Sequence, residues 1–324
     1  MSSGKFKVVI TDSYHPTLDA EREELQEIDA DLILEQCRTE DEIIAATRDA
    51  DAVMVQHANI SRRVVEHLEK CQIIARYGVG FDNVDVAAAT ECGIMVSNVP
   101  DYCIDEVSSH AIALLMACSR KIVQLSNSVK AGQWTYIVAE PVYKMIGQTL
   151  GIVGLGRIGS AAARKGLGLG LKVQAYDPYV FETDLDVVFV DFDILLRTSD
   201  FVSIHAPLTD ETYHMFGKNE FEKMKKGAFL VNTARGPIVD GAALYEALEA
   251  SEIAGAGVDV MEQEPISQDD PLLKLDNFII TPHTAWYSEA AQNLLQREAA
   301  RAVLAVLKGG RPRSLVNPEA VSDR

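Results

Sequence analysis

Positive charge is scarce in this 324-residue chain. Its 30 lysine and arginine residues are outnumbered by 48 aspartate and glutamate residues, so the formal net charge at pH 7 is −18. Such a surface repels phosphates, and we therefore expect no direct nucleic-acid partner. The net charge does not exclude a small anionic substrate, because one local arginine can outweigh a distant acidic surface.

Closely spaced cysteine pairs and long apolar runs are also missing, and we expect no secretory leader. All five cysteines lie in the first 118 residues and form no CxxC pair, which favours reduced thiols in a cytoplasmic protein. No apolar run approaches membrane-spanning length, and the start, MSSGKFKVVI, lacks the layout of a signal peptide. We expect a soluble cytoplasmic protein with no membrane partner and no bound metal.

Short β-prone runs alternate with helical stretches from end to end. The first series is FKVVIT, DLILE, AVMVQ, IIARY and IMVSN, and the second, from about residue 149, is TLGIV, KVQAY, DVVFV, FVSIH, AFLVN, GAGVD and FIIT. This alternation is typical of consecutive βα units and predicts parallel sheets. The strands are too many for one compact sheet, so we predict two α/β domains.

Two long helices are expected besides those within the βα units. Residues 104–131 predict one helix between the two series of strands, because apolar residues recur there at three- and four-residue intervals. A second helical segment, EAAQNLLQREAARAVLAVLKGG, follows residue 288 and stops at a pair of glycines.

A glycine-rich turn, GLGRIG, follows the strand 149–153. Gly154 permits a tight turn, Gly156 lets the backbone approach a pyrophosphate, and Gly159 lets the next helix pack closely on the strand. The start of that helix offers N–H groups and a positive dipole end to phosphates. The turn therefore predicts a dinucleotide site.

The context strengthens this weak motif and selects the cofactor. Asp177 directly follows the next strand, KVQAY, and lies 18 residues after Gly159. A carboxylate there can bind the ribose hydroxyls and repel a 2′-phosphate. GLGLG at 166–170 is better explained as a helix cap. YGVGFDN at 77–83 lacks the third glycine, although its bare N–H groups can face an anion. We predict that the protein binds NAD.

Three polar residues follow strands of the second series, where open parallel sheets bind their ligands. Arg235 follows AFLVNTA, Glu264 follows GVDVMEQ and His283 follows FIITP. Singly, each is more simply a surface arginine, a solvated glutamate or a capped histidine. Together they suit hydride transfer to a 2-oxo acid. Arginine binds the carboxylate and polarises the carbonyl, histidine donates a proton, and a carboxylate orients the imidazole and favours its charged form.

These motifs, taken in order, resemble the D-isomer-specific 2-hydroxyacid dehydrogenases over nearly the whole chain. The matching stretches are RYGVGFDNVD, GIVGLGRIG, SDFVSIHAPLT, GAFLVNTARGPIVD, GVDVMEQEP and TPHTAWYSE. YDPY, GAFLVNTARG and HTAWYSE are most similar to the C-terminal binding protein branch. The resemblance implies that Arg235 binds substrate, that His283 is the general acid/base and that Glu264 is its partner. Formate dehydrogenases carry glutamine in place of Glu264, which argues against formate.

The resemblance also implies the remaining site residues. Asp259 would lie near the nicotinamide carboxamide. The implied cofactor contacts are Gly154, Gly156, Arg157, Ile158, Gly159, Asp177, His205, Pro207, Thr212, Thr233, Ala234, Asp259 and His283. The implied substrate contacts are Arg76, the N–H groups of Val79 and Gly80, Tyr102, Arg235 and Trp286.

Two of these assignments leave alternatives open. Tyr102, in VPDYC, can equally well be a packing residue at the hinge. Trp286 stands where many relatives carry small residues, three positions after His283. There it would present an apolar plane to the substituent on C3 of the substrate, or it is a core or interface tryptophan.

The resemblance further implies the architecture. A Rossmann NAD-binding domain, 102–290, would be inserted into a flavodoxin-like substrate domain made of 1–101 and 291–324. Both would contain doubly wound parallel sheets. The 104–131 helix would belong to the interface of a homodimer.

The function predicted from these observations is NAD-dependent hydride transfer between NADH and a small 2-oxo acid, with the 2-hydroxy acid as substrate of the reverse reaction. The alternative from another class is an NAD(H)-sensing, corepressor-like binding protein of the C-terminal binding protein type, although we expect no flexible tail after KGGRPRSLVN. Within the enzymes, phosphoglycerate dehydrogenase stays open, but no appended regulatory domain is expected. Binding of Pro-x-Asp-Leu-Ser peptides, set against NADH oxidation, separates the two classes.

Overall fold

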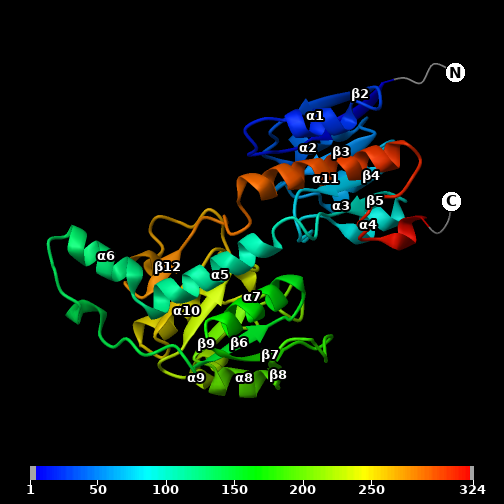
Figure 1. Ribbon diagram of the computed structural model, residues 1–324. Coiled ribbons are helices and arrows are strands. Elements are labelled where there is room, and N and C mark those ends of the chain that lie inside the picture. Colours follow the sequence, from blue (N-terminus) through cyan, green and yellow to red (C-terminus); the bar gives the residue numbers. More distant parts are fainter. Residues whose placement is uncertain (1–4, 322–324) are drawn as a thin grey trace. The chain divides into compact units, whose positions relative to one another are not determined.

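The chain forms two compact units. The computed structural model describes residues 5–321 (Figure 1). Unit 1 is made of the chain up to Cys103 and of the chain from Ser288 onward, and unit 2 is the continuous segment Ile104–Tyr287. The chain therefore crosses between units at 103/104 and 287/288, where we expected boundaries at 101/102 and 290/291. Unit 2 is inserted into unit 1, which confirms the predicted fold class.

The described part of unit 1 is built on a five-stranded parallel sheet with the order β2-β1-β3-β4-β5. This order is the flavodoxin-like one. The buried central strands consist largely of valine, isoleucine and alanine, as expected of a sheet covered on both faces. The strands are β1 (Phe6–Ile10), β2 (Ala30–Leu34), β3 (Ala52–Val55), β4 (Ile73–Arg76) and β5 (Met95–Ser97).

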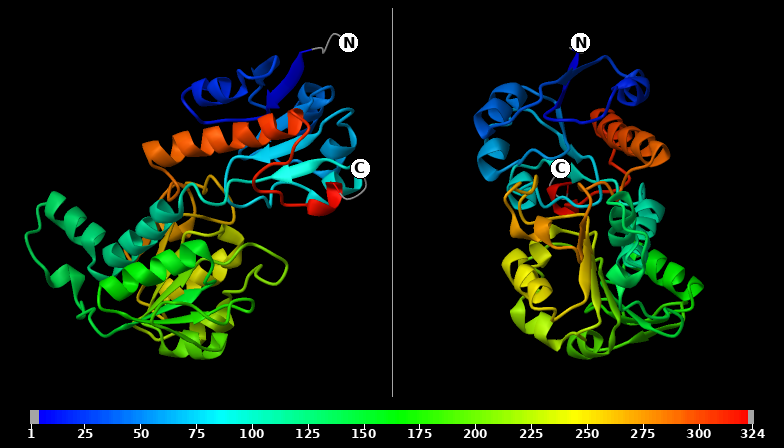
Figure 2. Two further views of the ribbon diagram at one scale, coloured as in Figure 1. Left: turned by 45° about the vertical axis from the view of Figure 1, so that its right-hand side comes forward. Right: turned by 90° about the vertical axis from the view of Figure 1, so that its left-hand side faces the viewer.

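Helices cover both faces of this sheet (Figure 2). On one face lie α1 (Asp19–Leu25) and α11 (Glu289–Leu307), and on the other lie α2 (Glu40–Thr47), α3 (Arg62–Glu66) and α4 (Val86–Glu91). The α11 helix confirms the predicted second long helix. Its start is capped by Ser288, whose hydroxyl accepts from Ala291 N, and Gly309, with φ of 83°, follows its end.

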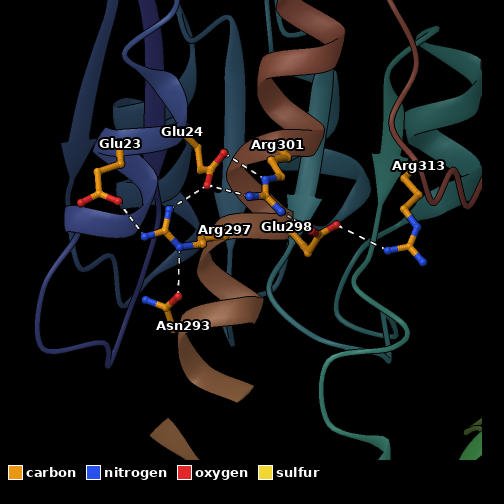
Figure 3. Close-up of polar contacts among 7 residues, drawn as sticks. All are labelled: Glu23, Glu24, Asn293, Arg297, Glu298, Arg301 and Arg313. Carbon is orange, nitrogen blue, oxygen red and sulfur yellow. Dashed lines mark hydrogen bonds and ion pairs between the residues drawn. The ribbon is translucent and has the colours of Figure 1, made fainter. Parts of the chain in front are cut away.

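Polar contacts hold α11 against α1. Buried Gln296 donates to both carboxylate oxygens of buried Glu21, at 2.9 and 3.1 Å, and Glu21 also accepts from the Tyr77 hydroxyl. Outside this contact, Arg297 and Arg301 both pair with Glu24 (Figure 3). Exposed ion pairs contribute little singly, but here they surround a buried hydrogen-bond network. These contacts attach α11, which follows the return of the chain at Ser288, to the first segment of unit 1.

The C-terminal segment extends the unit 1 sheet. Leu315 forms an antiparallel bridge with Ser97, and Val316 N donates to Val96 O at 2.8 Å. Buried Asn317 accepts from Val96 N at 2.7 Å and donates to Ile94 O at 3.0 Å. The segment ends in the short helix η4 (Pro318–Val321). It therefore covers the edge of β5.

Unit 2 has a seven-stranded parallel sheet in its described residues, with the order β12-β11-β10-β9-β6-β7-β8. The direction of the winding reverses between β6 and β9, and an open α/β sheet binds its ligands at such a point. The strands are β6 (Thr149–Val153), β7 (Lys172–Tyr176), β8 (Val187–Phe189), β9 (Phe201–Ile204), β10 (Phe229–Asn232), β11 (Gly255–Val258) and β12 (Phe278–Ile280).

Two hydrophobic cores lie on opposite faces of the unit 2 sheet. One is covered by α5 (Ile104–Ser119) and α7 (Arg157–Gly168), and the other by α8 (Phe192–Thr198), α9 (Lys218–Lys223) and α10 (Gly241–Glu249) (Figure 2). The α5 helix packs so closely on β11 that a Cβ on Gly257 would lie 3.0 Å from Cys118 Sγ. The short helices are η1 (Ile137–Ala139), η2 (Gly236–Ile238) and η3 (Pro271–Lys274).

The prediction of one continuous helix over 104–131 is wrong. The chain forms α5 and a separate α6 (Ile122–Lys130), because Lys121 adopts a left-handed conformation with φ of 53° that an α-helix cannot continue. The apolar spacing continues across the break, so it did not reveal the break. Ile122, the first residue of α6, is 55% exposed.

The strand predictions of both series are confirmed, since each predicted run overlaps one of the strands described above. The five cysteines are free, and Cys71, Cys103 and Cys118 are buried. Within residues 5–321, no helix is long and apolar enough to cross a membrane.

Candidate active site

The glycine-rich turn lies at the point where the unit 2 sheet reverses its winding. Gly154 has φ of 91°, and a Cβ there would lie 2.7 Å from Ala206 N, so a side chain would collide with the loop after β9. His205 N donates to Val153 O at 2.7 Å, which joins the two loops. Only glycine satisfies both the conformation and the close approach.

The other two glycines of the turn face different surroundings. A Cβ on Gly159 would lie 2.0 Å from Gly154 O, so this glycine lets α7 pack on the turn. A Cβ on Gly156 would meet nothing within 4 Å in the described chain. Gly156 precedes α7, whose first turn begins with Arg157 and Ile158. The open space at a helix start fits a phosphate group.

The Asp177 carboxylate lies beside this turn. One oxygen accepts from Leu155 N at 2.8 Å, and the other accepts from Tyr179 N at 2.8 Å and Val180 N at 3.1 Å. A carboxylate offers about four acceptor positions, so these bonds leave capacity for a ribose hydroxyl. The carboxylate is therefore fixed in place and remains able to bind a ligand.

The loop after β9 holds further residues predicted to bind the cofactor. His205 Nε2 is hydrogen-bonded to Ser203 Oγ at 2.9 Å, and burial lowers the pKa of His205 to about 4, so its imidazole is neutral at pH 7. Thr212 Oγ1 donates to the Pro207 carbonyl at 2.7 Å and thereby closes the turn that follows.

One buried hydroxyl in this region has an unmet hydrogen-bonding requirement. Thr233, directly after β10, is 8% exposed, and its Oγ1 has no hydrogen-bond partner in the part of the chain that the structure describes. Buried polar atoms are normally satisfied. An orphaned hydroxyl at the carboxyl edge of the sheet therefore fits a site that receives a polar ligand group.

His283 and Glu264 form a close pair. His283 Nδ1 lies 2.6 Å from Glu264 Oε2, and the second carboxylate oxygen accepts from Met261 N at 2.9 Å. Burial raises the pKa of Glu264, but the hydrogen bond and charge of His283 reverse this effect and leave that pKa below its ordinary value. The charge of Arg235 acts in the same direction. Since Nδ1 faces Glu264, Nε2 lies on the opposite side of the ring.

The turn that carries His283 is held by Asp259, a residue assigned above to the nicotinamide. Asp259 is 2% exposed, and its carboxylate accepts from Thr281 Oγ1 at 2.5 Å, Thr284 N at 3.0 Å and Ala285 N at 2.8 Å. These bonds stabilise His283 at φ of 51°, a conformation that costs a non-glycine residue about 1–2 kcal/mol. The hydrogen bonds accepted by the Asp259 carboxylate thus fix the backbone that carries His283.

His110 was not predicted from the sequence, yet it joins this network. Its Nε2 lies 2.9 Å from Thr281 Oγ1 and 3.7 Å from the Asp259 carboxylate. His110 belongs to α5, far from the strand-end motifs in sequence, so no local spacing indicated it.

The Arg235 turn lies against the segment that carries Glu264. A Cβ on Gly236 would lie 1.9 Å from the Met261 carbonyl carbon, so the chain after β10 touches the chain after β11. Asn232, also not predicted, accepts from Ala234 N at 3.0 Å and donates to Arg235 O at 2.9 Å. Its side chain thereby fixes the turn.

Trp286 is half-buried beside the histidine. Its indole Nε1 donates to His283 O at 3.1 Å, and its ring meets Tyr287 edge-on with centroids 5.6 Å apart. The indole therefore has a local structural contact, which leaves both predicted roles open.

The remaining predicted substrate contacts belong to unit 1. Arg76 ends β4, and its guanidinium lies over Gly78, because a Cβ there would be 1.4 Å from Arg76 Nη1. Val79 and Gly80 follow at once and are partly exposed. Tyr102 is 8% exposed, near the first crossing. The structure thus brings Arg76 together with Val79 and Gly80 in unit 1, and Arg235 with Glu264 and His283 in unit 2.

No group of histidine, cysteine, aspartate and glutamate side chains among residues 5–321 is arranged to hold a metal ion. The residues described above instead fit a dinucleotide, because a glycine turn, a helix start and a fixed carboxylate occur together at the reversal point of the sheet.

Comparison with known proteins gives the same picture. Residues 112–285 match the NAD binding domain of the D-isomer specific 2-hydroxyacid dehydrogenases. The chain is 44% identical over 290 residues to a glyoxylate reductase of Korarchaeum cryptofilum, covering 87% of each chain. It is 40% identical over 255 residues to a hydroxypyruvate reductase of Thermotoga maritima, covering 78% of this chain and 83% of the relative.

A solved structure is similar across both units. The D-lactate dehydrogenase of Aquifex aeolicus, complexed with NAD and lactic acid, is 29% identical and has a TM-score of 0.86, covering 95% of this chain and 98% of the other. The likeness to the C-terminal binding protein branch stays a prediction. The protein belongs to the family of NAD-dependent, D-isomer-specific 2-hydroxyacid dehydrogenases.

Proposed function

We propose that this protein is an NADH-dependent reductase of small 2-oxo acids. The observation that carries the proposal is the 2.6 Å pair of His283 and Glu264, with the charge of Arg235 close enough to lower the pKa of that carboxyl. Similarity to glyoxylate and hydroxypyruvate reductases supports these two acids as the first substrates to test.

His283 is the proposed proton donor. Its Nδ1 is engaged by Glu264, so Nε2 delivers a proton to the carbonyl oxygen as the hydroxyl forms. When bound, NADH supplies the hydride to the carbonyl carbon. Glu264 fixes the plane of the imidazole and stabilises its charged form, while Asp259 fixes the backbone beneath it.

Arg235 is the proposed ligand of the substrate carboxylate and carbonyl. A guanidinium presents several N–H donors in one plane, so it can hold a carboxylate and polarise the adjacent carbonyl. We assign the substrate carboxylate also to the N–H groups of Val79 and Gly80 and to Arg76. Tyr102 is retained as a further substrate contact.

The NAD site is proposed to include the glycine turn, Asp177 and the loops after β9 and β10. Arg157, Ile158, His205, Pro207, Thr212, Thr233, Ala234 and Asp259 are the further proposed contacts. The orphaned Thr233 hydroxyl supports a polar cofactor group at that position.

The proposal predicts NADH-dependent turnover of at least one acid from a panel of glyoxylate, hydroxypyruvate, pyruvate and larger 2-oxo acids. The kcat/KM with NADPH should be lower by about tenfold or more, because its 2′-phosphate would approach the Asp177 carboxylate. Steady-state assays with both cofactors measure the ratio of the two kcat/KM values. The variant Asp177→Asn should bring this ratio closer to one. Binding of NADH without turnover of any acid would contradict the proposal and favour a cofactor-sensing protein.

Glu264→Gln should move the reductive pH profile toward acid. The Glu264 carboxylate lies 2.6 Å from His283 Nδ1, and an adjacent negative charge favours the proton-carrying form of a general acid. Reduction requires the form of His283 that carries the proton to be donated, and this form is lost as pH rises. Removing the negative charge of Glu264 should therefore move the decline of activity at high pH to lower pH. We expect the shift toward acid in kcat/KM profiles, with little change in the Kd of NADH.

Glu262→Gln is the matched control for this variant. Glu262 lies two residues away and pairs with His214 at 2.8 Å, so its replacement should leave the profile in place. An identical profile for Glu264→Gln and wild-type protein would exclude the pairing from catalysis.

Trp286→Ala should change the ranking of 2-oxo acids in favour of bulkier ones. A pocket contact discriminates by roughly 10- to 200-fold in kcat/KM per methylene. Trp286→Phe is the matched control, since it loses the same N–H bond to His283 O but keeps a large ring. Equal losses for all acids in both variants would mean that the indole has only the structural role.

We also propose a homodimer, with the chain around α6 in its interface. In the segment 122–146 of unit 2, six large apolar side chains have more than half of their surface exposed: Ile122, Trp134, Tyr136, Ile137, Tyr143 and Ile146. Exposed apolar surface of this kind is typical of a protein-binding region. It overlaps the predicted 104–131 interface and continues beyond it.

Light scattering after gel filtration should give twice the 35.5 kDa chain mass. The double variant Trp134→Ser with Ile137→Ser should shift the mass toward that of one chain. Tyr179→Ser removes another highly exposed aromatic of unit 2 and should leave the mass unchanged. A wild-type protein that stays monomeric at micromolar concentration would refute the dimer.

A further inference from the structure

The loop Gly78–Gly80 is held by two neighbouring residues that follow β5. Val99 N donates to Gly78 O at 2.9 Å, and Asn98 Nδ2 donates to Val79 O at 2.6 Å. Two consecutive carbonyl groups of the loop are therefore bound from the same side, one by backbone and one by a side chain.

These bonds also determine where the loop N–H groups point. A trans peptide is planar, so a carbonyl and the N–H of the next residue point in opposite directions within one plane. Val99 thereby directs Val79 N–H, and Asn98 directs Gly80 N–H, away from the 98–99 segment. Neither N–H is bonded to another residue of the described chain, so both are available to an anion.

The Asn98 amide is itself held in one orientation. Ser314 Oγ donates to Asn98 Oδ1 at 2.6 Å. The Val79 carbonyl can only accept, so the amide nitrogen must face it and the amide oxygen must face Ser314. Both polar ends of the side chain are therefore engaged.

Ser314 belongs to the C-terminal segment, which is anchored on either side of it. Arg313 pairs with Asp101 at 3.2 Å. It also approaches Glu298 of α11 at 3.8 Å (Figure 3). Val316 N donates to Val96 O. The backbone on either side of Ser314 is thus bonded to other parts of unit 1, which fixes the position of its hydroxyl.

We propose that Asn98, held by Ser314, is a positioning residue that directs the Gly80 N–H toward the carboxylate of the 2-oxo acid. This inference rests on the proposed function. The guanidinium of Arg76, which lies over Gly78, adds a positive charge at the same loop. Hydrogen bonds weaken steeply when the N–H turns from its acceptor, so substrate binding depends on the side chain that fixes this peptide plane.

The test compares three alanine variants in the full-length protein. Asn98→Ala should raise the KM for glyoxylate and the Ki of the carboxylate inhibitor oxamate, each by about tenfold, the lower end for loss of a bond to a charged group. The Kd of NADH, measured by fluorescence, should stay within about twofold. Ser314→Ala should act in the same direction but more weakly, because Asn98 keeps its donor.

Asn317→Ala is the matched control. Asn317 lies on the same segment and bonds Val96, Ile94 and Thr90, but it does not contact the loop 78–80. It should lower the Tm while leaving the KM and Ki near the wild-type values.

Three results separate the outcomes. A raised KM and Ki in Asn98→Ala, with normal values in Asn317→Ala, supports the positioning role. Normal values in Asn98→Ala, or equal changes in both variants, overturn it while the proposed function stands. Wild-type protein that reduces no acid of the panel and does not bind oxamate with NADH overturns the proposed function and this role together.

Discussion

The edge of the unit 2 sheet depends on the buried carboxylate of Asp259. A buried charge is tolerated only when donors surround it, and here the donors come from the turn after β12. The carboxylate joins the ends of two strands and holds His283 in a backbone conformation that it would otherwise avoid. The imidazole can then meet Glu264, which lies on the chain that continues from Asp259. The Asp259 carboxylate fixes the backbone of His283, and the Glu264 carboxylate fixes its imidazole ring.

The fold could be predicted from the sequence to the extent that local patterns reflect burial. Short apolar runs separated by helical stretches identified the strands of both sheets, because a parallel strand is buried on both faces. The break at Lys121 could not be predicted in this way. Its left-handed conformation interrupts the helix, but the apolar spacing continues through Ile122. A period of three to four residues shows which side chains share a face and does not show that the backbone is continuous.

The candidate site also contains residues that local sequence patterns could predict and residues that they could not. The meeting of His283 with Glu264 could be predicted because each follows a strand within six residues, and the ends of parallel strands meet at one edge. Asn98 and Ser314 could not be predicted, since they are 216 residues apart and meet through the folding of the chain. Supporting residues of this kind act on peptide groups rather than on ligands, so no motif for a ligand identifies them.

The return of the chain to unit 1 has a consequence for the order in which the protein forms during synthesis. Unit 2 is one continuous segment that is complete in sequence at Tyr287, so it can fold while later residues are still being added. Unit 1 lacks α11 and the C-terminal segment that bonds to β5 until the chain has reached Asn317. Until then the edge of β5 is open, and an open edge is a template for pairing with other chains. The part of unit 1 before Cys103 therefore keeps an open sheet edge until the C-terminal segment of the chain has been made.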